Sequence, residues 1–127
     1  MDKKNDRTPS KEFLLNSFDE IVPILMAIGN PNRFKILVLL LDGPLNFQAL
    51  LNNMNLKKSA LANHLTKLKD KGLIKKIQHG TYSLTEDGNK YVIAIENTHK
   101  ESKNLEIKRE ILEKRKQMTM SFLERKE

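Results

Sequence analysis

The sequence predicts a mainly α-helical protein with one small β-hairpin, and three observations support this fold class. Apolar residues recur at steps of three and four through much of the 127-residue chain, which is the spacing of amphipathic helices. Two short runs rich in Ile, Tyr and Thr, LIKKIQ and TYSLT, flank His79 and Gly80 and are typical of a hairpin, with a left-handed turn that glycine adopts readily and histidine tolerates. A helix-start signal at Thr85 then opens a final helical stretch of about 40 residues.

The N-terminal part is expected to be a flexible polar arm, residues 1–10, followed by a helix with Ser10 as its N-cap. The apolar stripe of this helix consists of Leu14, Phe18, Ile21, Leu25 and Ile28. Pro23 interrupts the stripe, so we expect either a kink or two helices that meet between Glu20 and Pro23, the first being an N-terminal extension.

Three further helices are predicted from cap residues and apolar spacing. Asn30 and Pro31 form a cap and first-turn pair, and the helix behind them is strongly apolar and ends before Gly43. Its expected core residues are Phe34, Ile36, Leu37, Leu40 and Leu41. The segments FQALLNNM and KKSALANHLTKLKDK follow as two short helices with helix-turn-helix spacing, and the hairpin after them would form a two-stranded wing.

The long final helix predicts a homodimer. Its apolar residues resume after a polar gap from Glu96 to Asn104, and one small domain cannot bury so long a stripe, which implies a partner chain. The candidate dimerisation residues are Leu14, Phe18, Leu105, Ile107, Ile111, Leu112, Met118 and Phe122. We therefore divide the chain into the arm, a winged helix-turn-helix domain over residues 11–95 and a dimerisation helix over residues 96–127.

The positive charge of the chain is clustered. The net charge is +7, and the segment from Lys57 to Gly80 contributes +6 of it through seven lysines and one acid, Asp70. This segment covers the second helix of the pair and the wing, the two elements that a winged helix presents to double-stranded DNA. The candidate DNA-binding residues are Lys57, Lys58, Ser59, Ala62, Asn63, His64, Thr66, Lys67, Lys75, Lys76 and His79.

Several of these positions allow more than one role. Asn63 is expected on the outer face of its helix, because the opposite face should bury three leucines. Its side chain could pair with an adenine edge or remain solvated. His64 is expected mainly to pack beside the core with a ring nitrogen towards backbone or phosphate. Asp70 would fall on a different face of the helix, so the two residues do not form a catalytic pair. His79 could contact DNA or serve only as a turn residue.

The segments AIGNPNRFKIL, LKKSALANHLTKLKDKGLI and TYSLTEDG resemble winged-helix repressors of the ArsR type and their MarR-like and PadR-like relatives. The resemblance covers roughly residues 23–95 and implies a dimeric transcriptional regulator whose terminal helices form the dimer and whose Lys57–Thr66 segment enters the major groove. Lys57 stands where the family usually places a serine or threonine cap, which predicts a helix that either starts loosely or is completed by a phosphate contact. The cysteine ligands of metal-sensing members, and the acidic and histidine ligands on their terminal helix, are missing. Glu96 and His99 share a face of the last helix, but a lone pair of this kind is more often solvated.

Other classes of function have weaker support in the sequence. The chain shows no phosphate-binding glycine loop, paired catalytic carboxylates or nucleophile motif, so we expect no enzyme, cofactor or metal. Without a long apolar segment we expect a cytoplasmic protein that does not enter membranes. A small-molecule effector is possible but not indicated by the sequence. An architectural DNA-binding protein and a winged-helix module that binds another protein remain as alternatives. RNA binding is disfavoured because exposed aromatic residues are scarce.

Overall fold

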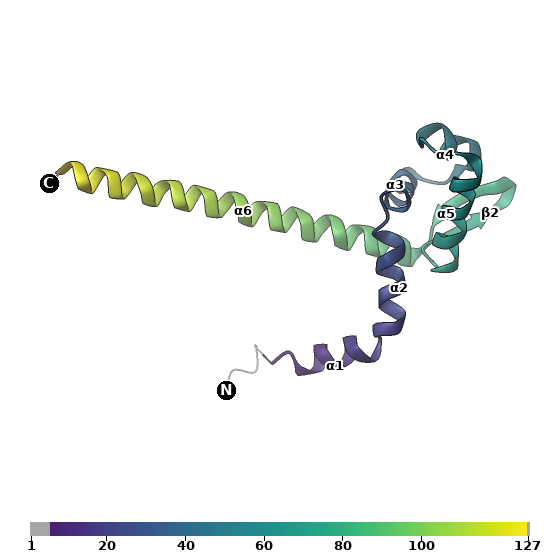
Figure 1. Ribbon diagram of the computed structural model, residues 1–127, viewed down its shortest axis with the longest axis horizontal. Coiled ribbons are helices and arrows are strands. Elements are labelled where there is room, and N and C mark those ends of the chain that lie inside the picture. The colour runs from purple at the N-terminus through teal and green to yellow at the C-terminus, as the bar shows by residue number, and fades with distance from the viewer. Residues whose placement is uncertain (1–5, 127) are drawn as a thin grey trace. The chain divides into compact units, whose positions relative to one another are not determined.

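The computed structural model describes residues 6–126 as two compact units, divided between Lys90 and Tyr91 (Figure 1). The first unit holds the helices and strands up to the first turn of the last helix, and the second unit is the remainder of that helix. Residues 1–5 of the expected polar arm and residue 127 lie outside the described residues.

The N-terminal region forms two helices, α1 (Thr8–Asn16) and α2 (Phe18–Ile28). Helix α1 begins two residues before the expected cap at Ser10, because Pro9 is favoured in a first turn and the amide of Thr8 donates to Asp6 Oδ1 at 3.0 Å.

The two helices meet at Ser17 and not between Glu20 and Pro23, so the predicted position of the break is wrong. Pro23 lies in the second turn of α2, and the helix continues through it to Ile28.

Helix α3 (Pro31–Leu39) and the short 3-10 turn η2 (Leu40–Asp42) form the centre of the core. The predicted cap is confirmed, since Asn30 Oδ1 accepts from the amides of Asn32 and Arg33 at 3.0 and 3.1 Å. The side chains of Ile36 and Leu37 are fully buried, and that of Leu40 nearly so. Leu41 was expected in the core but is 45% exposed, because the tighter turn at Leu40 directs the next side chain outwards.

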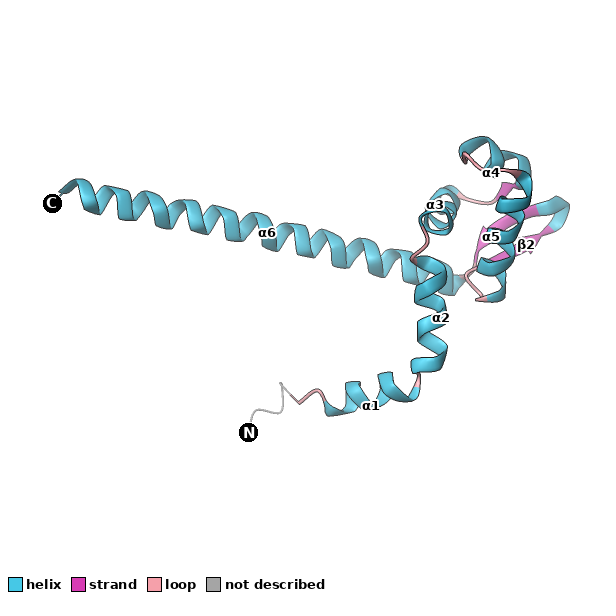
Figure 2. Cartoon of the chain, viewed as in Figure 1, coloured by secondary structure: helices cyan, strands magenta, loops and turns pink. Residues whose placement is uncertain are grey.

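The helix-turn-helix consists of α4 (Phe47–Asn53) and α5 (Lys58–Asp70), in close agreement with the predicted segments. Asn46 caps α4 by accepting from the amide of Ala49 at 2.8 Å. Helix α5 contacts α2, α3 and a strand of the wing (Figure 2). The three leucines of its inner face are buried. These leucines are Leu61, Leu65 and Leu68.

The wing is an antiparallel sheet of β1 (Leu45–Asn46), β2 (Ile74–Ile77) and β3 (Thr81–Leu84) in the order β1-β3-β2. The sequence predicts the hairpin of β2 and β3 but not β1, because two residues are too short to show the alternation of a strand. The hairpin turn η3 (Gln78–Gly80) has His79 at φ 62° and Gly80 at φ 67°, so the predicted left-handed turn is confirmed.

A short network of hydrogen bonds joins the wing to the start of α6 (Glu86–Lys126). The hydroxyl of Thr85 donates to the Gly72 carbonyl at 2.5 Å and accepts from the amide of Gly88 at 3.0 Å, so Thr85 caps the helix. The amide of Thr85 also donates to the carbonyl of Leu73 at 3.1 Å. This network fixes the end of β3 and the first turn of α6 within one unit.

The second unit is the part of α6 from residue 91 onward, a continuous helix with mostly exposed side chains. Neighbouring turns are linked by ion pairs, as between Lys100 and Glu96 at 2.8 Å and between Lys103 and Glu106 at 3.3 Å. Its large apolar side chains that are exposed are Ile93, Ile95, Leu105, Ile107, Ile111, Leu112, Met118, Met120, Phe122 and Leu123.

Among residues 6–126, no single helix is long and apolar enough to span a membrane. Helix α2 and residues Pro31–Asp42 meet that criterion only as a pair bent by 82°.

Candidate nucleic-acid interface

Helix α5 has an apolar inner face and a polar outer face. Four small or hydrogen-bonding residues, Ser59, Ala62, Asn63 and Thr66, are all exposed, as the helical spacing predicts. The hydroxyl of Thr66 donates to the Ala62 carbonyl at 3.0 Å, so in this conformation it can serve a ligand only as an acceptor. Asn63 therefore provides the most versatile group of this face, an amide that can donate and accept together.

The start of α5 carries positive charge and no side-chain cap. Lys57 precedes the helix in extended conformation, and no side chain in the described part of the chain caps this end. The absence of a side-chain cap at Lys57 agrees with the sequence, and α5 is a regular helix from Lys58 onward. Unpaired amides at a helix N-terminus attract phosphate, and the exposed side chains of Lys57 and Lys58 add to that attraction.

The lysines of the Lys57–Gly80 segment are all exposed. Within residues 6–126, none of these seven side chains forms an ion pair with a carboxylate. They comprise Lys57, Lys58, Lys67, Lys69, Lys71, Lys75 and Lys76. Because their charge is not neutralised within the chain, it is available to a polyanion.

The two wing lysines lie on opposite faces of the sheet, because neighbouring residues of a strand point to opposite sides. Lys75 pairs across the strands with Ser83, whereas Lys76 pairs with Tyr82 and places its ammonium 5.9 Å from the centre of the Tyr82 ring. His79 is exposed at the turn. The wing therefore offers two separate basic positions near its tip.

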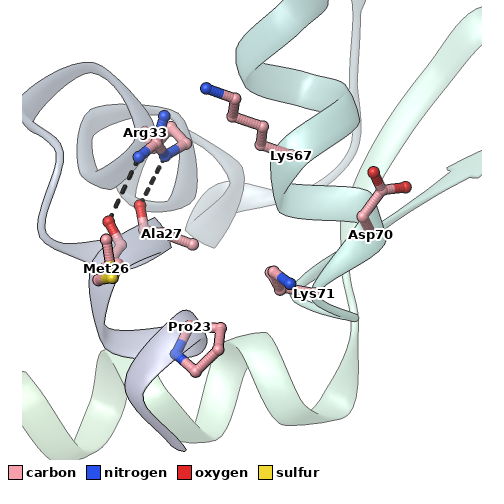
Figure 3. Close-up of a pocket in the computed structure, with 7 residues that line it drawn as sticks. All are labelled: Pro23, Met26, Ala27, Arg33, Lys67, Asp70 and Lys71. Atoms are coloured by element: carbon pink, nitrogen blue, oxygen red, sulfur yellow. Dashed lines mark hydrogen bonds between the residues drawn. The ribbon is translucent and has the colours of Figure 1, made fainter. Parts of the chain in front are cut away.

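Arg33 is a residue of this region that the sequence did not assign to the site. Its guanidinium binds the last turn of α2, where Nε donates to the Ala27 carbonyl at 2.8 Å and one terminal nitrogen donates to the Met26 carbonyl at 3.3 Å (Figure 3). The other terminal nitrogen lies 3.3 Å from Nδ1 of His64 on α5. Nδ1 of His64 is thus directed to this arginine, and the expected contact of a ring nitrogen with backbone or phosphate would fall to Nε2. No local pattern in the sequence could have found this contact, because the two residues are 31 positions apart.

The pKa of His64 lies below its ordinary value of 6.5. Partial burial of the ring disfavours the charged form, and the positive charges of Arg33 and Lys67 act in the same direction. His64 is therefore neutral at neutral pH.

A hollow of about 380 Å³ lies between α2, the start of α3 and the end of α5 (Figure 3). It is lined by Pro23, Met26, Ala27, Arg33, Lys67, Asp70 and Lys71. Lys67 and Lys71 follow Asn63 at intervals of four residues, so the three side chains lie on one side of α5. Because Lys67 and Lys71 line the hollow, it lies beside the C-terminal end of that helix. Three of its lining residues are basic and one is acidic.

The described residues contain no candidate metal site. No three or more of their His, Cys, Asp or Glu side chains lie close enough together to hold an ion. Glu96, which shares a helix face with His99, pairs with Lys100 at 2.8 Å.

Comparisons with known proteins agree with this geometry. The family model of bacterial regulatory proteins of the arsR family matches residues 30–76, from the Asn30 cap to β2. Reduced HlyU from Vibrio cholerae is 34% identical, with 67% of this chain and 92% of that chain covered and a TM-score of 0.55. The transcriptional regulator HlyU from Vibrio vulnificus is 25% identical, with coverages of 70% and 96% and a TM-score of 0.58.

More distant structures share the fold alone. Quinone-bound YodB from B. subtilis is 21% identical, with coverages of 64% and 92% and a TM-score of 0.56. No curated protein sequence matches the chain significantly. The family match and the HlyU structures confirm the predicted winged helix-turn-helix and a regulatory function that is not enzymatic. The chain belongs to the ArsR family and is a DNA-binding transcriptional regulator.

Proposed function

We propose that this regulator acts in the cytoplasm as a homodimer and recognises an inverted repeat in duplex DNA through α5. The observation that carries the proposal is the exposed polar face of α5, which lies opposite three buried leucines and within a segment of net charge +6. A dimer with two-fold symmetry presents two such helices, so the two half-sites should lie about one helical turn apart, roughly 34 Å.

The proposed interface separates specificity from affinity. Asn63, Ser59, Ala62 and Thr66 contact base edges, because short polar and small side chains allow close approach in the major groove. The lysines of α5 and of the wing contact phosphates, and His79 contacts the backbone beside the wing. The full set of DNA-binding residues is Lys57, Lys58, Ser59, Ala62, Asn63, His64, Thr66, Lys67, Lys75, Lys76 and His79.

We further propose that residues 11–95 form the DNA-binding domain and residues 96–127 the dimerisation helix. This is supported by the exposure of the predicted interface residues, with Leu112 63% and Met118 73% exposed within the monomer. Such a row of apolar side chains on a soluble regulator is costly in water, and a second copy would cover it. The proposed contacts are Leu14, Phe18, Leu105, Ile107, Ile111, Leu112, Met118 and Phe122.

The specificity proposal is tested by selecting bound duplexes from a random pool and then measuring the affinity of variants for the selected and a random duplex. Asn63→Ala should cost about 1 to 3 kcal/mol on the selected duplex and little on the random one. Lys75→Ala and Lys76→Ala should weaken both to the same extent. Equal losses for Asn63→Ala on both duplexes, with no inverted repeat selected, would favour an architectural protein instead.

The dimer proposal is tested by analytical ultracentrifugation of the full-length protein. Ile111→Glu should shift the protein from dimer towards monomer, because a carboxylate in an apolar interface is left without a partner. Gln117→Glu introduces the same side chain on the side of the helix away from the proposed contacts, since none of them lies three or four residues from it, and it should leave the dimer intact. Deletion of residues 104–127 should also weaken dimerisation. An intact protein that is monomeric at micromolar concentration would refute the proposal.

A further inference from the structure

We propose that Arg33 is a positioning residue for DNA binding. It holds His64 in the tautomer with the hydrogen on Nε2, and that N–H donates to a DNA phosphate next to α5. The inference rests on the proposed function only in taking α5 as the helix that meets DNA. The tautomer itself is a property of the free protein and can be measured without DNA.

The first step follows from the contact between Arg33 and His64. A guanidinium can only donate hydrogen bonds, so the Nδ1 atom 3.3 Å from it must be the acceptor. An imidazole that accepts at Nδ1 is neutral and carries its hydrogen on Nε2. Since the two nitrogens lie at different corners of the ring, Nε2 then points away from Arg33. The ring is partly exposed, so this N–H is open to a ligand.

The second step is that Arg33 is held in place before any ligand binds. Its guanidinium donates to the carbonyls of Ala27 and Met26, and its backbone amide is bound by the Asn30 cap at 3.1 Å. These bonds connect the end of α2 and the start of α3. The side chain is therefore pre-organised, and the orientation of the His64 ring does not have to be fixed at the moment of DNA binding.

The third step concerns the identity of the acceptor. His64 directly follows Asn63 and lies one turn before Lys67, so His64 and Lys67 are neighbours on the helix surface. The surroundings of the ring are cationic, with Arg33 from α3 and Lys67 from α5, which favours an anion. A phosphate oxygen can accept from the neutral Nε2–H while Lys67 neutralises its charge. His64 would then give a directional contact and Lys67 an ionic one.

The tautomer is tested in the full-length protein with ¹⁵N-labelled histidine by long-range proton–nitrogen correlation spectra. In the wild type, His64 should show a protonated Nε2 and an unprotonated Nδ1. Arg33→Met should convert this signature to a mixture of the two neutral tautomers, because the donor to Nδ1 is gone. A protonated Nδ1 in the wild-type protein would overturn the proposal, and this result does not depend on whether the Arg33 variant folds.

The phosphate contact is tested with two amide substitutions of His64. In His64→Gln the amide nitrogen lies near the position of Nε2 and can still donate, whereas His64→Asn places its amide near Nδ1 and removes that donor. On a duplex selected by the wild-type protein, His64→Asn should bind about 10-fold more weakly, and His64→Gln should bind nearly as the wild type. Equal affinities of the two variants would overturn the contact.

Salt dependence separates the neutral contact of His64 from an ionic one. Because a neutral donor releases no counterion, His64→Asn should weaken binding without changing the slope of log affinity against log salt. Lys67→Ala should lower that slope by about 1 for each phosphate that the lysine no longer neutralises. A reduced slope for His64→Asn would mean that the ring binds as a cation and would overturn the proposal. Failure of the wild type to bind any duplex would instead refute the proposed function, with the tautomer result unaffected.

Discussion

Gly88 in the first turn of α6 packs directly against the backbone of Leu73, so that a Cβ atom at position 88 would overlap the Leu73 carbonyl oxygen. That carbonyl also accepts the hydrogen bond from the amide of Thr85. Neither backbone group can move without disturbing the junction between the wing and α6. The absence of a side chain at position 88 is therefore a requirement of the packing.

Gly88→Ala should destabilise the protein by about 3 kcal/mol, the upper end of the usual cost of overpacking, because the obstructing atom is backbone and not a flexible side chain. Denaturant unfolding followed by circular dichroism measures the change. Asn89→Ala is the matched control, since residue 89 is exposed in the same turn, and it should change stability by less than about 0.5 kcal/mol. Similar stabilities of the two variants would show that the junction is more loosely packed than described.

Thr85→Val should cost about 1 to 2 kcal/mol of unfolding free energy, the usual effect of losing an N-cap. Valine keeps the shape of the side chain but removes the hydroxyl that donates to Gly72 and accepts from Gly88. Thr85→Ser retains the hydroxyl and should remain within about 0.5 kcal/mol of the wild type. If serine and valine were equally destabilising, packing of the methyl group would outweigh the cap.

The stability of the protein should decrease as pH falls below neutral, in part because of His64. Its pKa in the folded state is below the ordinary value of 6.5, so the unfolded chain takes up a proton first. The stabilisation is fully present above about pH 6.5 and is lost as the pH falls towards the folded-state pKa. Denaturant titrations across this range should give a shallower pH dependence for His64→Gln than for the wild type. An unchanged profile would place the effect on other groups.

DNA affinity should fall by roughly 10³ to 10⁵ between 50 and 200 mM salt if the dimer makes on the order of 6 to 10 phosphate contacts. Fluorescence anisotropy with a labelled duplex measures this dependence. Lys75→Ala and Lys76→Ala should each reduce the salt slope, whereas Lys90→Ala should not, because Lys90 lies outside the basic segment and pairs with Glu86 at 3.3 Å. A nearly flat salt dependence of the wild type would contradict phosphate neutralisation as the main source of affinity.

Much of the local structure could be predicted from the sequence, because its signals lie within a few residues of one another. The Asn30 cap bonds to amides two and three residues away, and the outward position of Asn63 follows from the helical period that buries Leu61 and Leu65. The left-handed turn at His79 and Gly80 was predicted for the same reason. The break at Ser17 was not predicted, because Pro23 is the stronger local signal for a break and yet α2 continues through it.

Contacts between distant residues were decided only by the tertiary structure. Arg33 and His64 are 31 positions apart, and neither residue signals in its own neighbourhood that the other will meet it. The overlap that excludes a side chain at Gly88 involves a carbonyl from the other end of the hairpin. Strand β1 is likewise defined by its pairing with β3 and not by its two residues. Periodicity and caps specify which elements form, whereas the packing of those elements selects which side chains meet, since hydrogen bonds and steric contacts act only at short range in space.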